Sequence, residues 1–195
     1  MKKDFLIVFD FFGVFSVDVA SLWVQKKFTP KVAMEITNTL FVQGDSGEIA
    51  LDELYIELAK IANISLKQVK NEWDKLVQID YNVINTARVL KKTYYTALLT
   101  NAPSPLVRNI LTCNGLLSCF DEIIISSEVK MIKPNPEIFK FVLEKFNKAA
   151  HQAVMIDDNI NNINTARKLG FSTIHFTSNT DLEKEIRNCR KITCN

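Results

Sequence analysis

The sequence predicts a three-layer α/β fold, in which helices cover both faces of a parallel sheet and a four-helix cap is inserted after the first strand. Three features predict it. Short, continuous apolar runs are typical of strands that are buried on both faces of a parallel sheet. Segments with apolar residues at helical spacing lie between most of these runs. A long segment after the first run, in contrast, contains helical patterns only.

Five apolar runs are the predicted strands. They lie at residues 5–9, 96–99, 122–125, 153–156 and 173–176. Three helices are predicted among the later strands, at residues 136–147, 160–169 and 181–189. Pro136 suits the first turn of a helix, and Gly170 suits the residue after one. Strands that alternate with helices indicate a parallel sheet with right-handed crossover connections.

Residues 17–79 are predicted to form the cap, and residues 1–16 and 80–195 the core. The four expected cap helices lie at residues 19–27, 31–41, 51–62 and 66–76. Residues 43–47 are expected to form a turn between the second and third of these helices. Trp23 and Trp73 are expected to pack inside the cap. A long insert at this place in the chain indicates a cover over a site.

The composition is typical of a soluble globular protein. Of the 195 residues, 47% are hydrophobic and 24% are charged, with a formal net charge of +2. This charge gives no electrostatic reason to expect a nucleic acid or a membrane surface as partner. Asp10 interrupts the first apolar run, so no signal peptide is predicted and the expected location is cytoplasmic. The cysteines, which form no CxxC pair, are expected to be free thiols; they are Cys113, Cys119, Cys189 and Cys194.

Polar and charged side chains follow the predicted strands where the strands end. Three carboxylates, a hydroxyl, an amide and an ammonium belong to this set, which comprises Asp10, Thr100, Asn101, Lys133, Asp157 and Asp158. Each residue alone is a common turn former, helix cap or surface charge. Because the carboxyl ends of parallel strands meet at one edge of the sheet, we expect these groups to converge. Together they suit a hard cation, such as Mg²⁺, and a phosphate group.

The same residues lie in four ordered motifs that resemble those of the haloacid dehalogenase superfamily. The motifs are FDFFGV at residues 9–14, LLTN at residues 98–101, residues 126–139 around Lys133, and residues 155–162 with the sequence MIDDNINN. The resemblance implies a Rossmann-like core, and the helical insert falls where a type-1 cap belongs. Within the superfamily, the chain is similar to α-glucose-1-phosphate phosphatases and to the phosphatase-type domain of soluble epoxide hydrolase. Shared features include GEI at residues 47–49 and Trp73.

This resemblance implies a Mg²⁺-dependent phosphatase that acts on a small phosphorylated metabolite, such as a sugar or nucleotide phosphate. Asp10 would attack phosphorus and form an aspartyl-phosphate. The metal ligands would be Asp10, Asp158 and the backbone carbonyl of Phe12, and Asp157 would either share the metal or support it. Thr100, Asn101 and Lys133 would bind the phosphate. Asn162 would orient Lys133 or an acidic neighbour, and the cap turn with Gly44, Asp45, Gly47 and Glu48 would select the substrate.

Two positions depart from the pattern of the superfamily. Phe12 stands where a phosphatase of this kind has an Asp that serves as general acid and base. General acid–base catalysis contributes roughly a hundredfold to ten-thousandfold to a rate, so we expect slow or narrow activity. Lys130 stands where Gly is common, and it would either bind phosphate or point into solvent.

Two other functions were weighed against the phosphatase. One is a non-catalytic module that keeps the fold and binds a phosphorylated ligand or a protein. The other is a metal-independent 2-haloacid dehalogenase, which has an aromatic residue at the position of Phe12. The dehalogenase is disfavoured because no Arg precedes Arg88 and because the Asp157–Asp158 pair suits a metal. Neither His151 nor His175 is assigned a role.

Overall fold

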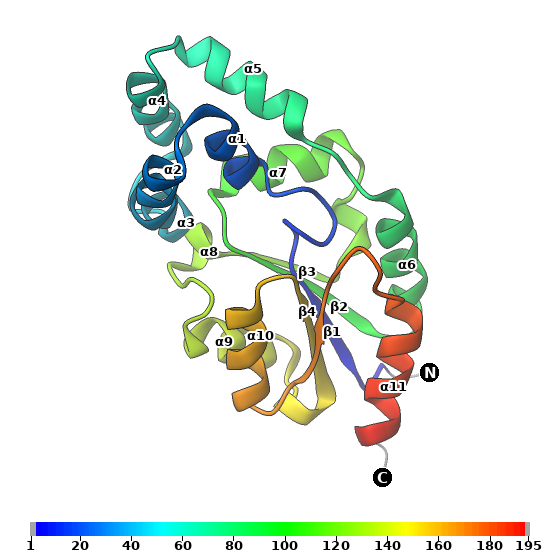
Figure 1. Ribbon diagram of the computed structural model, residues 1–195. Coiled ribbons are helices and arrows are strands. Elements are labelled where there is room, and N and C mark those ends of the chain that lie inside the picture. Colours follow the sequence, from blue (N-terminus) through cyan, green and yellow to red (C-terminus); the bar gives the residue numbers. More distant parts are fainter. Residues whose placement is uncertain (1–2, 194–195) are drawn as a thin grey trace.

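The computed structural model describes residues 3–193 and contains one five-stranded parallel sheet (Figure 1). The strand order is β3-β2-β1-β4-β5, so the first strand lies at the centre. The strands are β1 (Leu6–Phe9), β2 (Tyr95–Thr100), β3 (Glu122–Ile125), β4 (Ala153–Asp157) and β5 (Ser172–His175). All five predicted strands are therefore present, with ends that shift by at most one residue.

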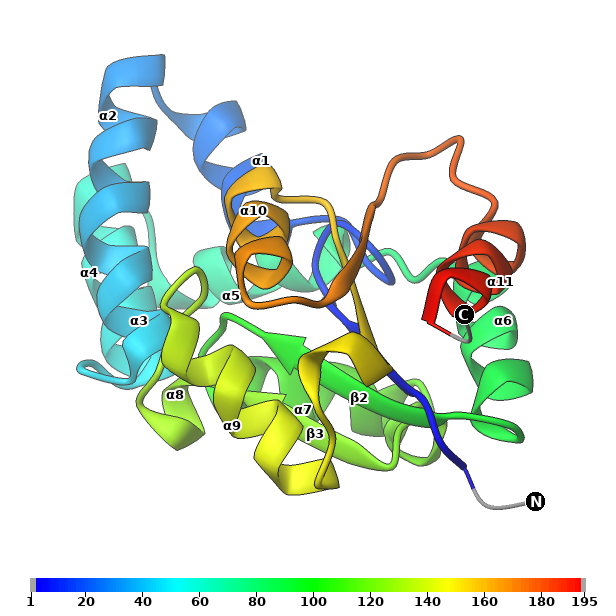
Figure 2. The same cartoon turned by 90° about the horizontal axis from the view of Figure 1, so that it is seen from below.

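Helices cover both faces of the sheet, which confirms the predicted three layers (Figures 1 and 2). One apolar cluster joins the sheet to α6 (Tyr81–Lys91), α7 (Ser104–Cys113) and α11 (Leu182–Thr193). The other joins it to α9 (Pro136–Phe146) and α10 (Ile160–Lys168). Helices α6 and α7 were not predicted from the sequence. Short helical segments complete the core, at α8 (Ser126–Val129), η2 (Leu117–Cys119) and η3 (Ala150–Gln152).

The cap lies between β1 and β2 in the chain and above the carboxyl ends of the strands (Figure 1). Its helices are α1 (Val19–Lys27), α2 (Pro30–Ile36), η1 (Thr37–Phe41), α3 (Val42–Ser46), α4 (Leu51–Ala62) and α5 (Leu66–Leu76). The segments that enter and leave the cap lie side by side. Ser16 forms a bridge with Ile79, and the backbone N–H of Asp80 donates to the carbonyl of Phe15 at 2.8 Å.

The turn expected at residues 43–47 was wrong. The second cap helix instead continues through α2, η1 and α3 to Ser46. Gly44 lies inside the helix, where it allows close packing, because a Cβ at this position would come within 3.1 Å of Leu54 and 3.3 Å of Pro103. The chain leaves the helix only at Gly47, which has a φ of 71° and so adopts the left-handed conformation that glycine tolerates best.

An aromatic cluster holds the cap helices together, as expected for Trp23 and Trp73. Both indoles are 2% exposed, and their ring centroids lie 6.4 Å apart. Tyr55 meets Trp73 edge to face at 5.2 Å, and the indole N–H of Trp23 donates to Glu72 at 2.7 Å. These cap residues are continuous with the apolar cluster on one face of the sheet.

Two other expectations concern the chain as a whole. Cys113, Cys119 and Cys189 are free thiols, as expected, while Cys194 lies outside the described residues. Across residues 3–193, no helix has both the length and the apolar character that a membrane span requires.

Leu98, in β2, tests the contribution of the sheet to stability, because its side chain is fully buried. Leu98→Ala should lower the free energy of unfolding by about 2–5 kcal/mol through lost burial and a new cavity. Urea denaturation followed by circular dichroism measures the change. Val89→Ala serves as the control, since Val89 is 55% exposed and its replacement should change stability by less than about 0.5 kcal/mol. Equal losses in the two variants would contradict the assigned core.

Candidate active site

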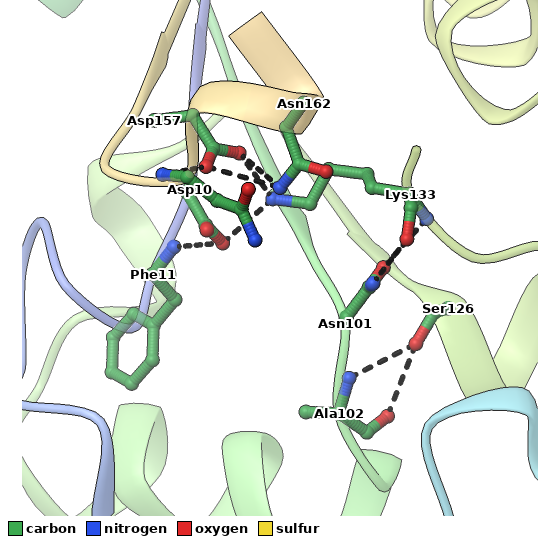
Figure 3. Close-up of polar contacts among 9 residues, drawn as sticks. Asp10, Phe11, Asn101, Ala102, Ser126, Lys133, Asp157 and Asn162 are labelled. Atoms are coloured by element: carbon green, nitrogen blue, oxygen red, sulfur yellow. Dashed lines mark hydrogen bonds and ion pairs between the residues drawn. The ribbon is translucent and has the colours of Figure 1, made fainter. Parts of the chain in front are cut away.

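The carboxyl ends of three adjacent strands bring the predicted polar side chains together (Figure 3). Asp10 follows β1, Thr100 ends β2 and Asp157 ends β4. Lys133 reaches the same place from the loop between α8 and α9. All four residues are buried, and Asp158 follows Asp157 with a more exposed side chain. The strand order places β1 between β2 and β4, which explains why residues so far apart in the chain meet here.

The ammonium group of Lys133 is the centre of the site. Its Nζ lies 2.9 Å from Asp10 Oδ1 and 2.7 Å from Asp157 Oδ2, and its side chain is only 1% exposed. The side chain of Asn101 fixes the backbone of Lys133, because its Oδ1 accepts from the Lys133 N–H at 2.8 Å and its Nδ2 donates to the Lys133 carbonyl at 2.7 Å. The Asn101 amide therefore faces Lys133 at both ends, whereas the sequence analysis expected it on a phosphate.

The two carboxylates beside Lys133 differ in how many partners they have. Asp157 accepts from the backbone N–H of Asn159 at 2.8 Å and from Asn162 Nδ2 at 3.0 Å, in addition to Lys133. Both of its oxygens are thus occupied. Asp10 Oδ1 accepts from Lys133 and from the Phe11 N–H at 2.7 Å, while Oδ2 has no partner among residues 3–193. One oxygen of Asp10 is therefore open to a ligand.

The site has an excess of negative charge. The nearest oxygens of Asp10, Asp157 and Asp158 lie within 4.8 Å of one another, with Lys133 as their counter-ion. Burial, followed by the charge of Asp157, raises the pKa of Asp10 to about 8, although Lys133 opposes the shift. Burial and Asp157 likewise raise the pKa of Asp158. Burial alone would lower the pKa of Lys133, but the charges of Asp10 and Asp157 raise it above its ordinary value. A cation with oxygen preference fits this donor set.

Gly13 lies directly against Asp158. Its φ is 82°, and a Cβ at this position would come within 2.1 Å of Asp158 Oδ2. Any side chain would therefore displace the carboxylate. The ring of Phe12 lines the cavity beside Asp10 and meets Phe11 edge to face at 5.0 Å.

The hydroxyl group of Thr100 is buried and finds no hydrogen-bond partner within the described part of the chain. Leaving a buried polar group unpaired costs about 1–3 kcal/mol, so such groups usually have a ligand or water as partner. The hydroxyl lies at the same cavity as the open oxygen of Asp10 and the ammonium group of Lys133.

A cavity of about 470 Å³ separates these core residues from the cap. Its cap wall combines apolar side chains, such as Phe41, Leu54 and Trp73, with polar residues, among them Thr37 and Asn38. Of the four predicted cap residues, Asp45 alone lines it; Gly44 is buried against Leu54, and neither Gly47 nor Glu48 reaches the cavity.

Two hydrogen bonds attach the cap to the core beside Asp45. The hydroxyl of Ser126 donates to the carbonyl of Asp45, and Lys130 Nζ donates to the carbonyl of Gly47 at 2.7 Å. Lys130 thus contacts the cap, and neither of the two expectations for it, phosphate binding or a side chain in solvent, describes this contact. Burial raises the pKa of Asp45 to about 7, the charge of Asp18 adds to the shift, and Lys133 opposes it.

Two residues at the site were missed by the sequence analysis. Asp18 lines the cavity and accepts from the N–H and hydroxyl of Ser21 at the start of α1. His175 Nε2–H donates to the carbonyl of Asp158 at 2.8 Å, so this histidine has a partner after all. The position of His175 at the end of a predicted strand was the available signal.

Comparison with known proteins gives a consistent result. Residues 8–176 match the sequence model of a family described as haloacid dehalogenase-like hydrolase. The D-ribitol-5-phosphate phosphatase of Bacteroides thetaiotaomicron is 24% identical over 200 residues, which cover 92% of this chain and 95% of that protein. The drimenol cyclase DrtB of Aspergillus calidoustus is 24% identical over 88% of this chain, which spans only 34% of the longer relative.

A solved structure supports the fold. An enzyme of the same family from B. thetaiotaomicron, crystallised with magnesium and inorganic phosphate, superposes with a TM-score of 0.75 at 23% identity. The match covers 92% of this chain and 97% of that one.

Lys133→Met tests the role of the central ammonium group. Removal of the positive charge leaves Asp10 and Asp157 buried without a counter-ion, so the free energy of unfolding at about pH 9 should fall by about 3–5 kcal/mol. The loss should be smaller at about pH 6, because Asp10 then carries a proton. Urea denaturation at both pH values measures it. Lys140→Met removes an exposed pair with Glu137 and should have little effect; a similar loss in both variants would contradict this assignment.

Asp45 should make stability depend on pH. Its pKa rises from 3.8 to about 7 on folding, so the folded chain keeps a proton that the unfolded chain releases. The retained proton stabilises the folded chain. This contribution to the free energy of unfolding is complete below about pH 4 and is lost as the pH rises through about 7. The side chain in Asp45→Asn does not titrate. As the pH rises from about 4 to about 7, the free energy of unfolding of this variant should therefore increase by roughly 2–4 kcal/mol relative to that of the wild type. A constant difference between the two unfolding curves would contradict the shifted pKa.

Proposed function

The chain belongs to the haloacid dehalogenase-like hydrolases, and on this basis we propose that it is a Mg²⁺-dependent phosphatase that acts on a small phosphate monoester. The observation that carries the proposal is the unpartnered hydroxyl of Thr100, which lies at one cavity with the open oxygen of Asp10 and the ammonium of Lys133. A nucleophile, a hydrogen-bond donor and a cation around one small space are the groups that a phosphoryl group requires.

The donor set fits a magnesium ion. Asp10 and Asp158 would hold the ion with carboxylate oxygens, and the backbone carbonyl of Phe12 is the third proposed ligand. The charge balance supports this assignment, because three carboxylates face one ammonium group. Between the two aspartates of β4 and its loop, Asp158 is the better ligand, since both oxygens of Asp157 already have partners. The bound ion would neutralise charge on the phosphate.

The other residues would position and stabilise the reacting groups. Asp10 attacks phosphorus through its open Oδ2 and forms an aspartyl-phosphate, which water then hydrolyses. Thr100 donates to a phosphate oxygen, and Lys133 neutralises both the phosphate and Asp10. Asp157 and Asn162 hold the ammonium group in place through their mutual hydrogen bonds. Asn101 acts on the backbone of the same lysine.

The substrate class follows from the cavity and from the relatives. A space of about 470 Å³ suits a small metabolite. The B. thetaiotaomicron relative is named for a sugar-alcohol phosphate, which supports a sugar or polyol phosphate here. A nucleotide phosphate of similar size stays within this proposal.

The two alternatives receive less support. A binding module would need neither an open nucleophile oxygen nor a buried lysine beside it, yet the chain keeps both. A 2-haloacid dehalogenase needs a cation in the cap for the substrate carboxylate, and among the described residues Lys133 is the sole basic side chain that lines the cavity.

Asp10→Asn tests the proposed function. p-Nitrophenyl phosphate has an activated leaving group that needs little help from an acid, so it reports on the nucleophile and the metal alone. We expect Mg²⁺-dependent turnover by the wild type, its loss in EDTA, and a fall of about a thousandfold or more in Asp10→Asn. Thermal unfolding of the variant verifies that it is folded. If the wild type shows no turnover with any divalent cation, the phosphatase proposal is wrong.

A further inference from the structure

We propose that Asp45, which the cap contributes to the cavity, is the catalytic acid and base of this site and performs the proton transfers that Phe12 cannot. The inference rests on the proposed phosphatase function and adds to it a residue that lies outside the four motifs. Phosphatase chemistry on an unactivated ester needs a proton for the departing oxygen. The residue at position 12 has no proton to give.

Asp45 lies on the side of the cavity where the leaving group must be. Asp10 attacks from the core, so an in-line displacement directs the departing oxygen away from the sheet and toward the cap. Asp45 lines the cap side of the cavity that Asp10, Thr100 and Lys133 line from below. Its carboxyl group has no hydrogen-bond partner among the described residues, and is free to bind a substrate oxygen.

The core holds the backbone of Asp45 in place. The hydroxyl of Ser126 accepts from the N–H of Ala102 at 2.9 Å and donates to the carbonyl of Asp45 (the contact with Ala102 is visible in Figure 3). Ala102 lies two residues after Thr100, so the loop that carries the phosphate-binding hydroxyl also positions Asp45. The contact of Lys130 with Gly47, at 2.7 Å, holds the end of the same helix. Asp45 is thus attached to the active-site loops although it belongs to the cap.

Other acidic residues at the cavity already have other partners. Asp18 uses both carboxylate oxygens on Ser21, where it caps α1. Asp10 is the proposed nucleophile, and Asp158 is the proposed metal ligand. Among the described residues that line the cavity, Asp45 is the carboxyl group without such a role.

The environment of Asp45 also suits proton transfer near neutral pH. Burial raises its pKa to about 7, with Asp18 adding to the shift and Lys133 opposing it. A group with a pKa near the working pH is both a good donor and a good acceptor.

The proposed steps balance. Asp10 Oδ2 bonds to phosphorus while the bond from phosphorus to the leaving oxygen breaks, and the electron pair of that bond takes the proton of Asp45. The products are the free alcohol, the aspartyl-phosphate and the Asp45 carboxylate. In the second half, water attacks phosphorus and gives a proton to the Asp45 carboxylate. The bond between phosphorus and Asp10 Oδ2 breaks, so inorganic phosphate is released and the Asp10 carboxylate is restored.

The test compares two substrates on Asp45→Asn. Phenyl phosphate has a poor leaving group and p-nitrophenyl phosphate has a good one. We expect kcat/KM, which reports the steps up to departure of the leaving group, to fall by about a hundredfold or more for phenyl phosphate and by less than about tenfold for p-nitrophenyl phosphate. The value of kcat also includes hydrolysis of the aspartyl-phosphate, a step shared by both substrates, so it should fall for both. Asp52→Asn is the matched control, because it removes an acidic group from the cap surface, where Asp52 pairs with Lys70. It should leave both rates unchanged.

One further variant and one further measurement separate catalysis from folding. Phe12→Asp combined with Asp45→Asn should recover at least about tenfold in phenyl phosphate turnover, because it restores an acid at the other position. Stabilisation of Asp45→Asn by Mg²⁺ with inorganic phosphate, measured by thermal unfolding, should match that of the wild type. An equal loss of kcat/KM on both substrates, or a wild type that hydrolyses p-nitrophenyl phosphate but not phenyl phosphate, would overturn the role of Asp45. Absence of wild-type turnover on either substrate would instead refute the phosphatase function itself.

Discussion

The burial of Lys133 between two carboxylates is the constraint on which the site depends. An ammonium group that is 1% exposed is tolerated only because Asp10 and Asp157 lie within 2.9 Å and 2.7 Å of it. Two further polar side chains support this arrangement. Asn101 accepts a hydrogen bond from the backbone of Lys133, and Asn162 donates one to Asp157. The central position of β1, between β2 and β4, makes the arrangement possible. The fold and the chemistry therefore share one set of contacts.

Under the proposed role of Asp45, the substitution at residue 12 moves a chemical task to another part of the molecule. With phenylalanine there, the core presents the open oxygen of Asp10, an ammonium group and a hydroxyl to the cavity. The cap contributes two carboxyl groups to the cavity, and that of Asp45 has no hydrogen-bond partner among the described residues, whereas that of Asp18 accepts from Ser21. In this view the reaction is divided between two parts of the chain, and contact between the parts becomes a requirement for catalysis as well as for substrate selection.

Much of the fold and most of the site could be predicted from the sequence. The five strands were visible because buried parallel strands are continuous apolar runs, and their ends marked Asp10, Thr100 and Asp157. Helices α6 and α7 were missed, and α3 was taken for a turn because residues 43–47, with the sequence QGDSG, have turn composition. Gly44 instead lies inside the helix, where it packs closely against Leu54 and Pro103, and this contact depends on tertiary structure. The partners of Asn101 and Lys130 depend on tertiary contacts that no local pattern encodes. For the same reason, the sequence did not indicate the contact of Asp18 with Ser21, and it gave only the position of His175 near the end of a predicted strand.

The entry and exit of the cap have a consequence for how such proteins diversify. Ser16 and Ile79 are bridged, so the inserted segment starts and finishes at one point on the core. Lengthening a loop whose ends already meet costs little entropy, so the core tolerates inserts of different size at this point. A lineage could exchange the whole insert and acquire a new leaving-group pocket while the nucleophile and its lysine stay intact. If Asp45 is the acid, as proposed, exchange of the insert would also remove or replace that acid. The choice of insert would then affect catalysis as well as substrate selection.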